Sequence, residues 1–157
     1  MACFSAEGGH RFVLNLAPVI DVSMATLRAS DPLIVNESEA QALMARFGED
    51  VGAAGLAVSL HSMLGVPIVV TLGAQGADVV DDEGVCRHVA ALELTGRVVD
   101  STGAGDALVG GTAAALSAGQ SLVEAVRAGA GAAREVLSRR GAAGARPDDP
   151  AGQGDRT

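Results

Sequence analysis

One stretch of the sequence decides the fold: Val98-Val99-Asp100-Ser101-Thr102-Gly103-Ala104-Gly105-Asp106-Ala107-Leu108-Val109-Gly110-Gly111. Two β-branched residues end a strand, a turn of small residues follows, and an apolar, Ala-rich run predicts a helix over 104–117. Because Gly103, Ala104 and Gly105 carry almost no side chain, their backbone N–H groups can approach an anion closely at the helix N-terminus. Asp106 follows in the first helical turn, beside such an anion. An anion hole with an adjacent carboxylate suits transfer of a phosphoryl group to a hydroxyl.

The same residues also have a purely structural interpretation. An aspartate in a first helical turn is a common capping device, and Gly-Ala-Gly can be a simple close-packed turn. Short glycine motifs are frequent by chance, so the surrounding sequence has to decide between the two interpretations.

Composition excludes several classes of protein. With 157 residues, 48% of them hydrophobic, the chain can form one domain with a sizeable core. A formal net charge of −8 argues against a nucleic-acid partner. All 11 basic residues are arginine, so the lysine of a P-loop cannot be supplied. Phosphate binding would have to rest on backbone N–H groups, arginine or a metal ion.

The cysteines, histidines and apolar runs carry no further site. Cys3 and Cys86 form no CxxC pair, which favours two free thiols in a reducing compartment. His10, His61 and His88 lack metal-ligand spacing, so we expect ordinary surface or packing roles. No apolar run is long enough for a bilayer and no signal-peptide pattern opens the chain, which predicts a cytoplasmic protein without a membrane partner.

Strands alternate with helices along the chain, which predicts an α/β architecture with a mostly parallel sheet and helices on both faces. The strongest strand prediction is 67–72, which is apolar throughout and therefore central in the sheet. The acidic cluster at 81–84 predicts a solvated hairpin turn rather than a metal site. The expected strands are 11–16, 31–35, 67–72, 77–80, 85–92 and 97–99; the expected helices are 19–27 (short helix or loop), 40–47, 51–64, 104–117 and 122–138.

A second candidate site is Asn36-Glu37-Ser38-Glu39, directly after the expected strand 31–35. Its structural interpretation is a helix start, with Asn36 as the N-cap and Glu39 as its capping-box partner. That role is compatible with ligand binding, because residues at the carboxyl ends of strands face the crevice where ligands bind.

A third candidate site is Thr71-Leu72-Gly73-Ala74-Gln75-Gly76, which ends the strongest strand. The alternative is a simple turn into the next strand. All three candidate sites follow strand ends, and such ends line one crevice in a parallel sheet, so the three segments are expected to converge.

Together these motifs resemble the ribokinase-like (PfkB) family of carbohydrate kinases. Its second signature, Asp-x-Thr-Gly-Ala-Gly-Asp, stands complete at 100–106, and the family also carries Asn-x-x-Glu and Thr-Leu-Gly-x-x-Gly after strands, as at 36–39 and 71–76. The resemblance runs from about residue 11 to about residue 141 and covers the C-terminal half of a family member. The family's Gly-Gly sugar motif and its β lid have no counterpart, which implies a ribokinase-like fold truncated on the N-terminal side.

The resemblance implies roles for individual residues. Asp106 would be the catalytic base, with Gly103, Ala104 and Gly105 as the anion hole. Nucleotide contacts would come from Asn36, Thr71, Gly73 and Gly76. Glu39 would hold Mg²⁺ through water, and Asp100 and Thr102 match ligands of a monovalent cation such as K⁺.

The resulting expectation is ATP-dependent phosphoryl transfer to a sugar or sugar-like hydroxyl, incomplete in the isolated chain because the sugar-binding half is missing. A homo-oligomer or a complementing chain could supply that half. The competing expectation is a non-catalytic module that binds nucleotide or a partner, and a third is a fragment that does not fold alone. The expected domain is the nucleotide-binding half over 11–146, between a frayed start at 1–10 and a disordered tail at 147–157.

Overall fold

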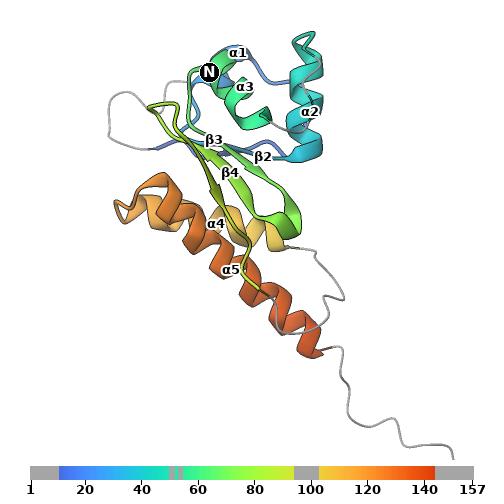
Figure 1. Cartoon of the computed structure of the whole chain (residues 1–157), viewed down its shortest axis with the longest axis vertical. Helices are drawn as coiled ribbons and strands as arrows, with labels where there is room; N and C mark the ends of the chain where they lie inside the picture. The colour runs from blue at the N-terminus through green and yellow to red at the C-terminus, as the bar shows by residue number, and fades with distance from the viewer. Residues whose placement is uncertain (1–10, 50–51, 53–54, 94–102, 144–157) are drawn as a thin grey trace, which may run out of the picture.

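The computed structural model describes residues 11–49, 52, 55–93 and 103–143. In chain order the elements are β1 (Leu14–Asn15), α1 (Met24–Arg28), β2 (Leu33–Asn36), α2 (Glu37–Arg46), α3 (Leu56–Leu64), β3 (Ile68–Thr71), the 3₁₀ turn η1 (Gly73–Gln75), β4 (Ala77–Val80), β5 (Cys86–Val89), α4 (Ala104–Ser117) and α5 (Leu122–Ala143). They form three layers, with α1–α3 above the sheet and α4 and α5 below it (Figure 1).

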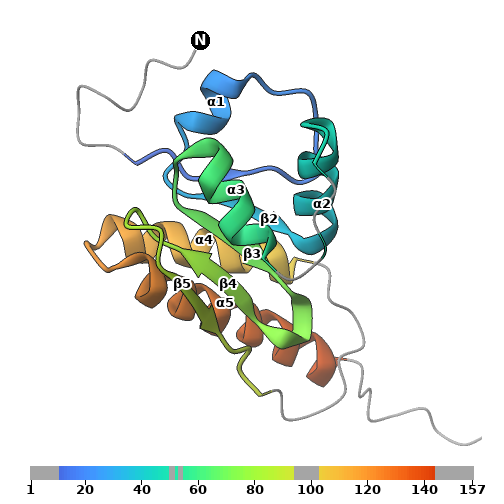
Figure 2. The ribbon, with the colours of Figure 1, turned by 45° about the horizontal axis from the view of Figure 1, so that its top comes forward.

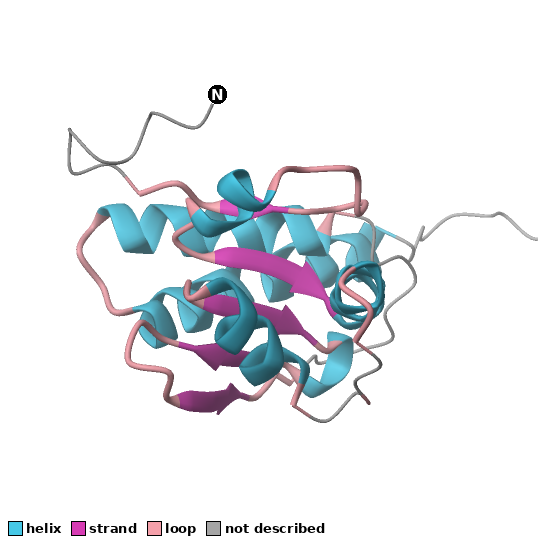
Figure 3. Ribbon diagram, turned by 90° about the horizontal axis from the view of Figure 1, so that it is seen from above, coloured by secondary structure: helices cyan, strands magenta, loops and turns pink. Residues whose placement is uncertain are grey.

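The five strands of the sheet lie side by side in chain order (Figure 3). β1, β2 and β3 are parallel, whereas β4 is antiparallel to both of its neighbours, β3 and β5. Because β4 alone is reversed, β5 points the same way as β3. The α/β fold with a mostly parallel sheet and helices on both faces is therefore confirmed, as is the central position of the strand at 67–72.

Alternating residues of β2 and β3 build two separate cores, because successive side chains of a strand point to opposite faces. Leu33 and Ile68 belong to the core beneath α1–α3, and both are 0% exposed. Ile34 and Val69 belong to the core that packs on α4 and α5. The predicted hairpin of β4 and β5 is confirmed around the turn at 81–84.

Several boundaries differ from the expected ones. β1 covers only 14–15 of the expected 11–16; it pairs only with β2 within the described residues, and Leu14 is half-buried where a buried strand was expected. α3 begins at Leu56, because Gly55 takes a left-handed backbone (φ 93°), and α5 continues to Ala143. The expected strand 97–99, the start 1–10 and the tail 147–157 lie outside the described residues.

α4 and α5 approach each other closely through glycine. A Cβ added at Gly111 would meet the Gly129 Cα at 2.9 Å, and one added at Gly129 would overlap the Leu108 carbonyl oxygen and Thr112 Oγ1. These glycines therefore let the two helix backbones come together below the sheet.

Candidate functional site

Two of the three predicted segments lie side by side at one end of the sheet. Asn36 ends β2 and Thr71 ends β3, and the parallel register makes them direct partners across the strand pair. Asn36 is exposed and Thr71 is half-buried, so both residues reach the surface where their strands end. The expected convergence of these two segments is a consequence of this register.

Asn36 and Glu39 form the predicted capping box at the start of α2. Asn36 Oδ1 accepts the Glu39 N–H at 2.8 Å, and Glu39 Oε2 accepts the Asn36 N–H at 2.8 Å. Ser38 Oγ also donates to Asn36 Oδ1, at 2.8 Å. Glu39 Oε1 has no hydrogen-bond partner within the described chain, so the carboxylate keeps an oxygen that could face a hydrated cation.

The segment after Thr71 is a tight 3₁₀ turn. The Leu72 N–H donates to the Gly76 carbonyl at 2.8 Å, and the Gly76 N–H donates to the Gly73 carbonyl at 3.2 Å. Gly76 has φ 109°, and a Cβ there would overlap the Val89 carbonyl oxygen. Glycine is thus required at Gly76 by the backbone alone. Gly73 is also left-handed (φ 59°), but it is exposed and a Cβ added there would meet nothing within 4 Å.

The start of α4, like that of α3 at Gly55, has no side-chain cap. Asn36 and Ser121 cap α2 and α5 with their side chains, but α4 begins at Gly103, whose backbone is left-handed (φ 84°) and supplies no side-chain cap. The first-turn N–H groups, including those of Ala104 and Gly105, therefore have no side-chain cap among the described residues. Asp106 lies in this turn and is exposed, not packed in the apolar core.

The start of α4 lies at the same end of the sheet as the other two segments. Leu108 and Val109 of α4 pack in the core that contains Ile34 and Val69. Ile34 lies two residues before Asn36 on β2, and Val69 lies two residues before Thr71 on β3. Figures 1 and 2 both show α4 beginning at the end of the sheet where β3 turns into β4. The predicted cation ligands Asp100 and Thr102 lie outside the described residues.

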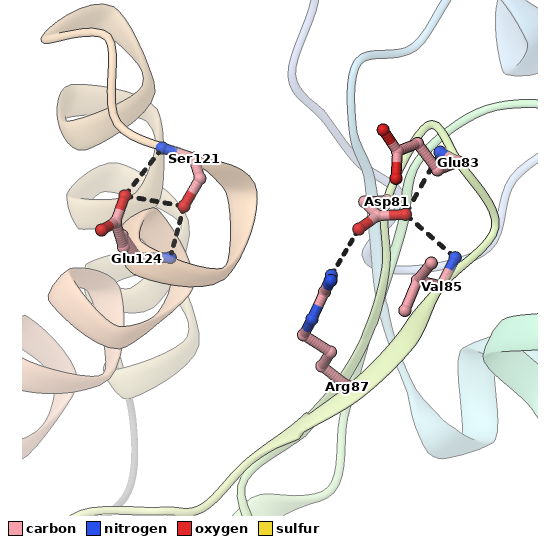
Figure 4. A network of polar contacts seen from close by, with 6 residues as sticks. All are labelled: Asp81, Glu83, Val85, Arg87, Ser121 and Glu124. Atoms are coloured by element: carbon pink, nitrogen blue, oxygen red, sulfur yellow. Dashed lines mark hydrogen bonds and ion pairs between the residues drawn. The ribbon is translucent and has the colours of Figure 1, made fainter.

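The acidic cluster at 81–84 is a hairpin turn, as predicted (Figure 4). Asp81 Oδ1 accepts the N–H groups of Val85 at 2.9 Å and Glu83 at 3.1 Å, and Asp81 also pairs with Arg87. The Val85 hydrogen bond, followed by that of Arg87, lowers the pKa of Asp81 below its usual value. No group of three or more potential metal ligands occurs within the described residues.

Sequence reasoning missed one residue near the site, His88. The histidine was expected to have an ordinary surface role, yet its ring contacts Asp78 on β4 and the Gln75 carbonyl in η1. The available signal was the hairpin itself, since pairing 77–80 with 86–89 puts Asp78 opposite His88.

The described helices include none with the length and apolar character needed to cross a bilayer.

Fold and site together define an α/β protein with an uncapped glycine turn beside a carboxylate. The profile of the pfkB family of carbohydrate kinases matches residues 3–149. A cytidine kinase from Thermococcus kodakarensis is 42% identical over 109 residues, which cover 69% of this chain and 38% of that protein. The chain belongs to the pfkB family of carbohydrate kinases.

Solved structures agree with this assignment. Ribokinase from Thermotoga maritima is similar with a TM-score of 0.75 at 31% identity, over 90% of this chain and 47% of that one. Ribokinase from Arabidopsis thaliana, solved with ribose and ATP, has a TM-score of 0.70 at 26% identity, over 82% of this chain and 42% of that one. This chain thus spans less than half the length of these relatives.

Proposed function

We propose that this chain is the nucleotide-binding and phosphoryl-transferring half of an ATP-dependent kinase for a sugar or nucleoside hydroxyl. The observation that carries the proposal is the uncapped start of α4, where Gly103 and the following small residues leave backbone N–H groups beside the exposed Asp106. Asn36 and Thr71 lie at the same end of the sheet. The relatives that act on sugars and nucleosides support both acceptor classes.

In the proposed reaction, Asp106 accepts the proton of the acceptor hydroxyl. The hydroxyl oxygen forms a bond to the γ-phosphorus of ATP, the bond from that phosphorus to the β,γ-bridging oxygen breaks, and ADP leaves. The N–H groups of Gly103, Ala104 and Gly105 hold the charge that develops on the transferring oxygens. Because they are already in place at the helix start, they need little reorganisation.

The remaining residues would hold the nucleotide and its cations. Asn36, Thr71, Gly73 and Gly76 are proposed nucleotide contacts, and Glu39 would face Mg²⁺ through water with its free oxygen. Mg²⁺ would neutralise charge on the phosphates. Asp100 and Thr102 are proposed ligands of K⁺.

The acceptor is proposed to bind residues that this chain does not contain, since the relatives are more than twice as long. A second copy or a complementing chain would then supply them. Without them, the acceptor hydroxyl is not held in line with the γ-phosphorus, and alignment of this kind is worth about 7–11 kcal/mol in well-oriented reactions.

The test separates binding from chemistry. ATP binding to the full chain is measured by calorimetry, and ADP release is measured across a panel of sugars and nucleosides, for the wild type and for Asp106→Asn. We expect the variant to bind ATP like the wild type and to lose acceptor-dependent turnover by about 10²–10⁴-fold.

The matched control is Asp82→Asn, the same substitution at an exposed residue of the hairpin turn, which should change neither quantity. Acceptor-dependent turnover that Asp106→Asn leaves unchanged while ATP is bound would overturn the catalytic role of Asp106 and favour the non-catalytic module. Failure to bind ATP in a cooperatively folded chain would overturn the proposal.

A further inference from the structure

His88 connects strand β5 to the turn after β3. Its Nδ1 lies 2.8 Å from Asp78 Oδ1, and its Nε2 lies 3.0 Å from the Gln75 carbonyl oxygen. A carboxylate and a carbonyl can only accept hydrogen bonds, so both ring nitrogens must donate for both contacts to form. The doubly protonated imidazolium is the one form of the ring that does so.

The 73–76 turn, which contains Gln75, packs directly against the end of β5. Gly76 lies so close to the end of β5 that a Cβ would overlap the Val89 carbonyl oxygen, so backbone packs on backbone there. The bonds that close the turn, from Leu72 N–H to the Gly76 carbonyl and from Gly76 N–H to the Gly73 carbonyl, lie within the turn itself. Among the described residues, His88 is the side chain that hydrogen bonds this turn to strand β5.

We infer that His88 is a positioning residue, whose imidazolium holds the Gln75 carbonyl and thereby fixes the 73–76 turn in the shape that receives the nucleotide. That a nucleotide binds at this turn rests on the proposed function. That His88 holds the turn rests on the contacts described above. It makes nucleotide affinity depend on pH through a residue that does not touch the nucleotide.

The charges around His88 support this role. Asp78 faces the ring from β4, and the thiol of Cys86 lies two residues earlier on β5, with its pKa raised by burial and then by Asp78. Arg87 points to the other face of the sheet, where it pairs with Asp81 and where α5 packs.

The helix α3 packs against β4, and its one titratable side chain is His61. On α3, His61 directs its Nδ1 to the Val66 carbonyl at 2.8 Å. The Asp78 hydrogen bond is the largest cause of the raised pKa of His88. Since the pKa of His88 is raised, its hydrogen bond to the Gln75 carbonyl is fully formed below the ordinary histidine pKa. It is lost as pH rises through the pKa of His88 in the folded chain.

The first experiment needs no nucleotide. The ring C–H shifts of His88 and the backbone amide shift of Gly76 are followed by NMR across pH. We expect the ring to titrate with a midpoint above about 6.5, and the Gly76 amide to follow with the same midpoint. Asp78→Asn should lower the midpoint of the ring, and a Gly76 amide that does not follow the ring would overturn the inference.

The second experiment measures ATP affinity by calorimetry at pH values on both sides of that midpoint. Wild-type affinity should fall about two- to tenfold as His88 loses its proton, the range expected for one net hydrogen bond. His88→Gln should give a flat profile. Arg87→Gln, which removes a cation one residue away on the opposite face, should keep the wild-type dependence.

The outcomes distinguish the two proposals. A wild-type chain that binds ATP equally at both pH values, or a His88→Gln chain that keeps the pH dependence, would overturn the role of His88. A chain that binds no ATP at any pH would overturn the proposed function, and the joint titration of His88 and Gly76 would then still decide whether the ring fixes the turn.

Discussion

On one face of the sheet, α1–α3 bury large aliphatic side chains such as Leu43, Leu60 and Ile68, all 0% exposed. On the other face, α4 and α5 meet through Gly111 and Gly129, with no room for a methyl group between them. Figure 2 shows the two layers on either side of the strands. The core under α1–α3 is therefore stabilised by large buried side chains. The α4–α5 pair opposite depends instead on the lack of a side chain at Gly111 and Gly129.

The largest effect is expected from removing volume on the α1–α3 face. Leu60→Ala leaves a cavity at a site that is 0% exposed, and it should lower the free energy of unfolding by about 2–5 kcal/mol. Val58→Ala on the same helix is the control, because Val58 is 42% exposed and its loss should stay within about 0.5 kcal/mol. Equal effects in denaturant unfolding would contradict the description of this core.

A smaller effect is expected from adding volume on the opposite face. Gly129→Ala puts a methyl group against the Leu108 carbonyl and Thr112 Oγ1, and should lower the free energy of unfolding by about 1–3 kcal/mol. Gly131→Ala, two residues further along α5, meets nothing within 4 Å and should raise it by about 0.5–1 kcal/mol. The opposite signs, measured by thermal or denaturant unfolding, test the difference between the two layers; two stabilising substitutions would contradict it.

Local sequence signals predicted much of the fold because their physics is local. α4 spans Ala104–Ser117 as expected, since a glycine-rich turn precedes it and Gly119 follows it. The predicted capping box at Asn36 formed because its contacts span only three residues, and the structure has the same local contact between Ser121 and Glu124. The hairpin of β4 and β5 followed from turn residues between two alternating runs.

Features that depend on distant partners could not be predicted. The length of β1 depends on what lies beside an edge strand, which hydrophobic pattern alone does not encode. The packing role of Gly129 depends on where α4 crosses α5. The contact of His88 with Gln75 depends on the register of β4 against β5 and on the shape of η1, so a scattered histidine looked like an ordinary surface residue.

The two capping boxes give the smallest and most discriminating test, because the same motif occurs in both layers. Asn36→Ala and Ser121→Ala should each lower the free energy of unfolding by about 0.5–2 kcal/mol. Ser121 hydrogen bonds, first from its side chain and then from its backbone, lower the pKa of Glu124 (Figure 4). Their stabilisation is therefore present above the unfolded-state pKa of Glu124 and is lost as pH falls through its folded-state pKa.

The two substitutions should differ in their effect on ATP affinity, because only Asn36 lies at the end of the sheet proposed to bind nucleotide. Asn36 ends β2 beside Thr71, so Asn36→Ala is expected to weaken ATP binding as well as the helix. Ser121 lies in the link between α4 and α5, so Ser121→Ala should leave ATP affinity unchanged, and its difference from the wild type in unfolding free energy should shrink in acid. Calorimetry with ATP at matched folded fractions measures this. If both variants lost affinity equally, the loss would reflect stability rather than a nucleotide contact at the end of β2.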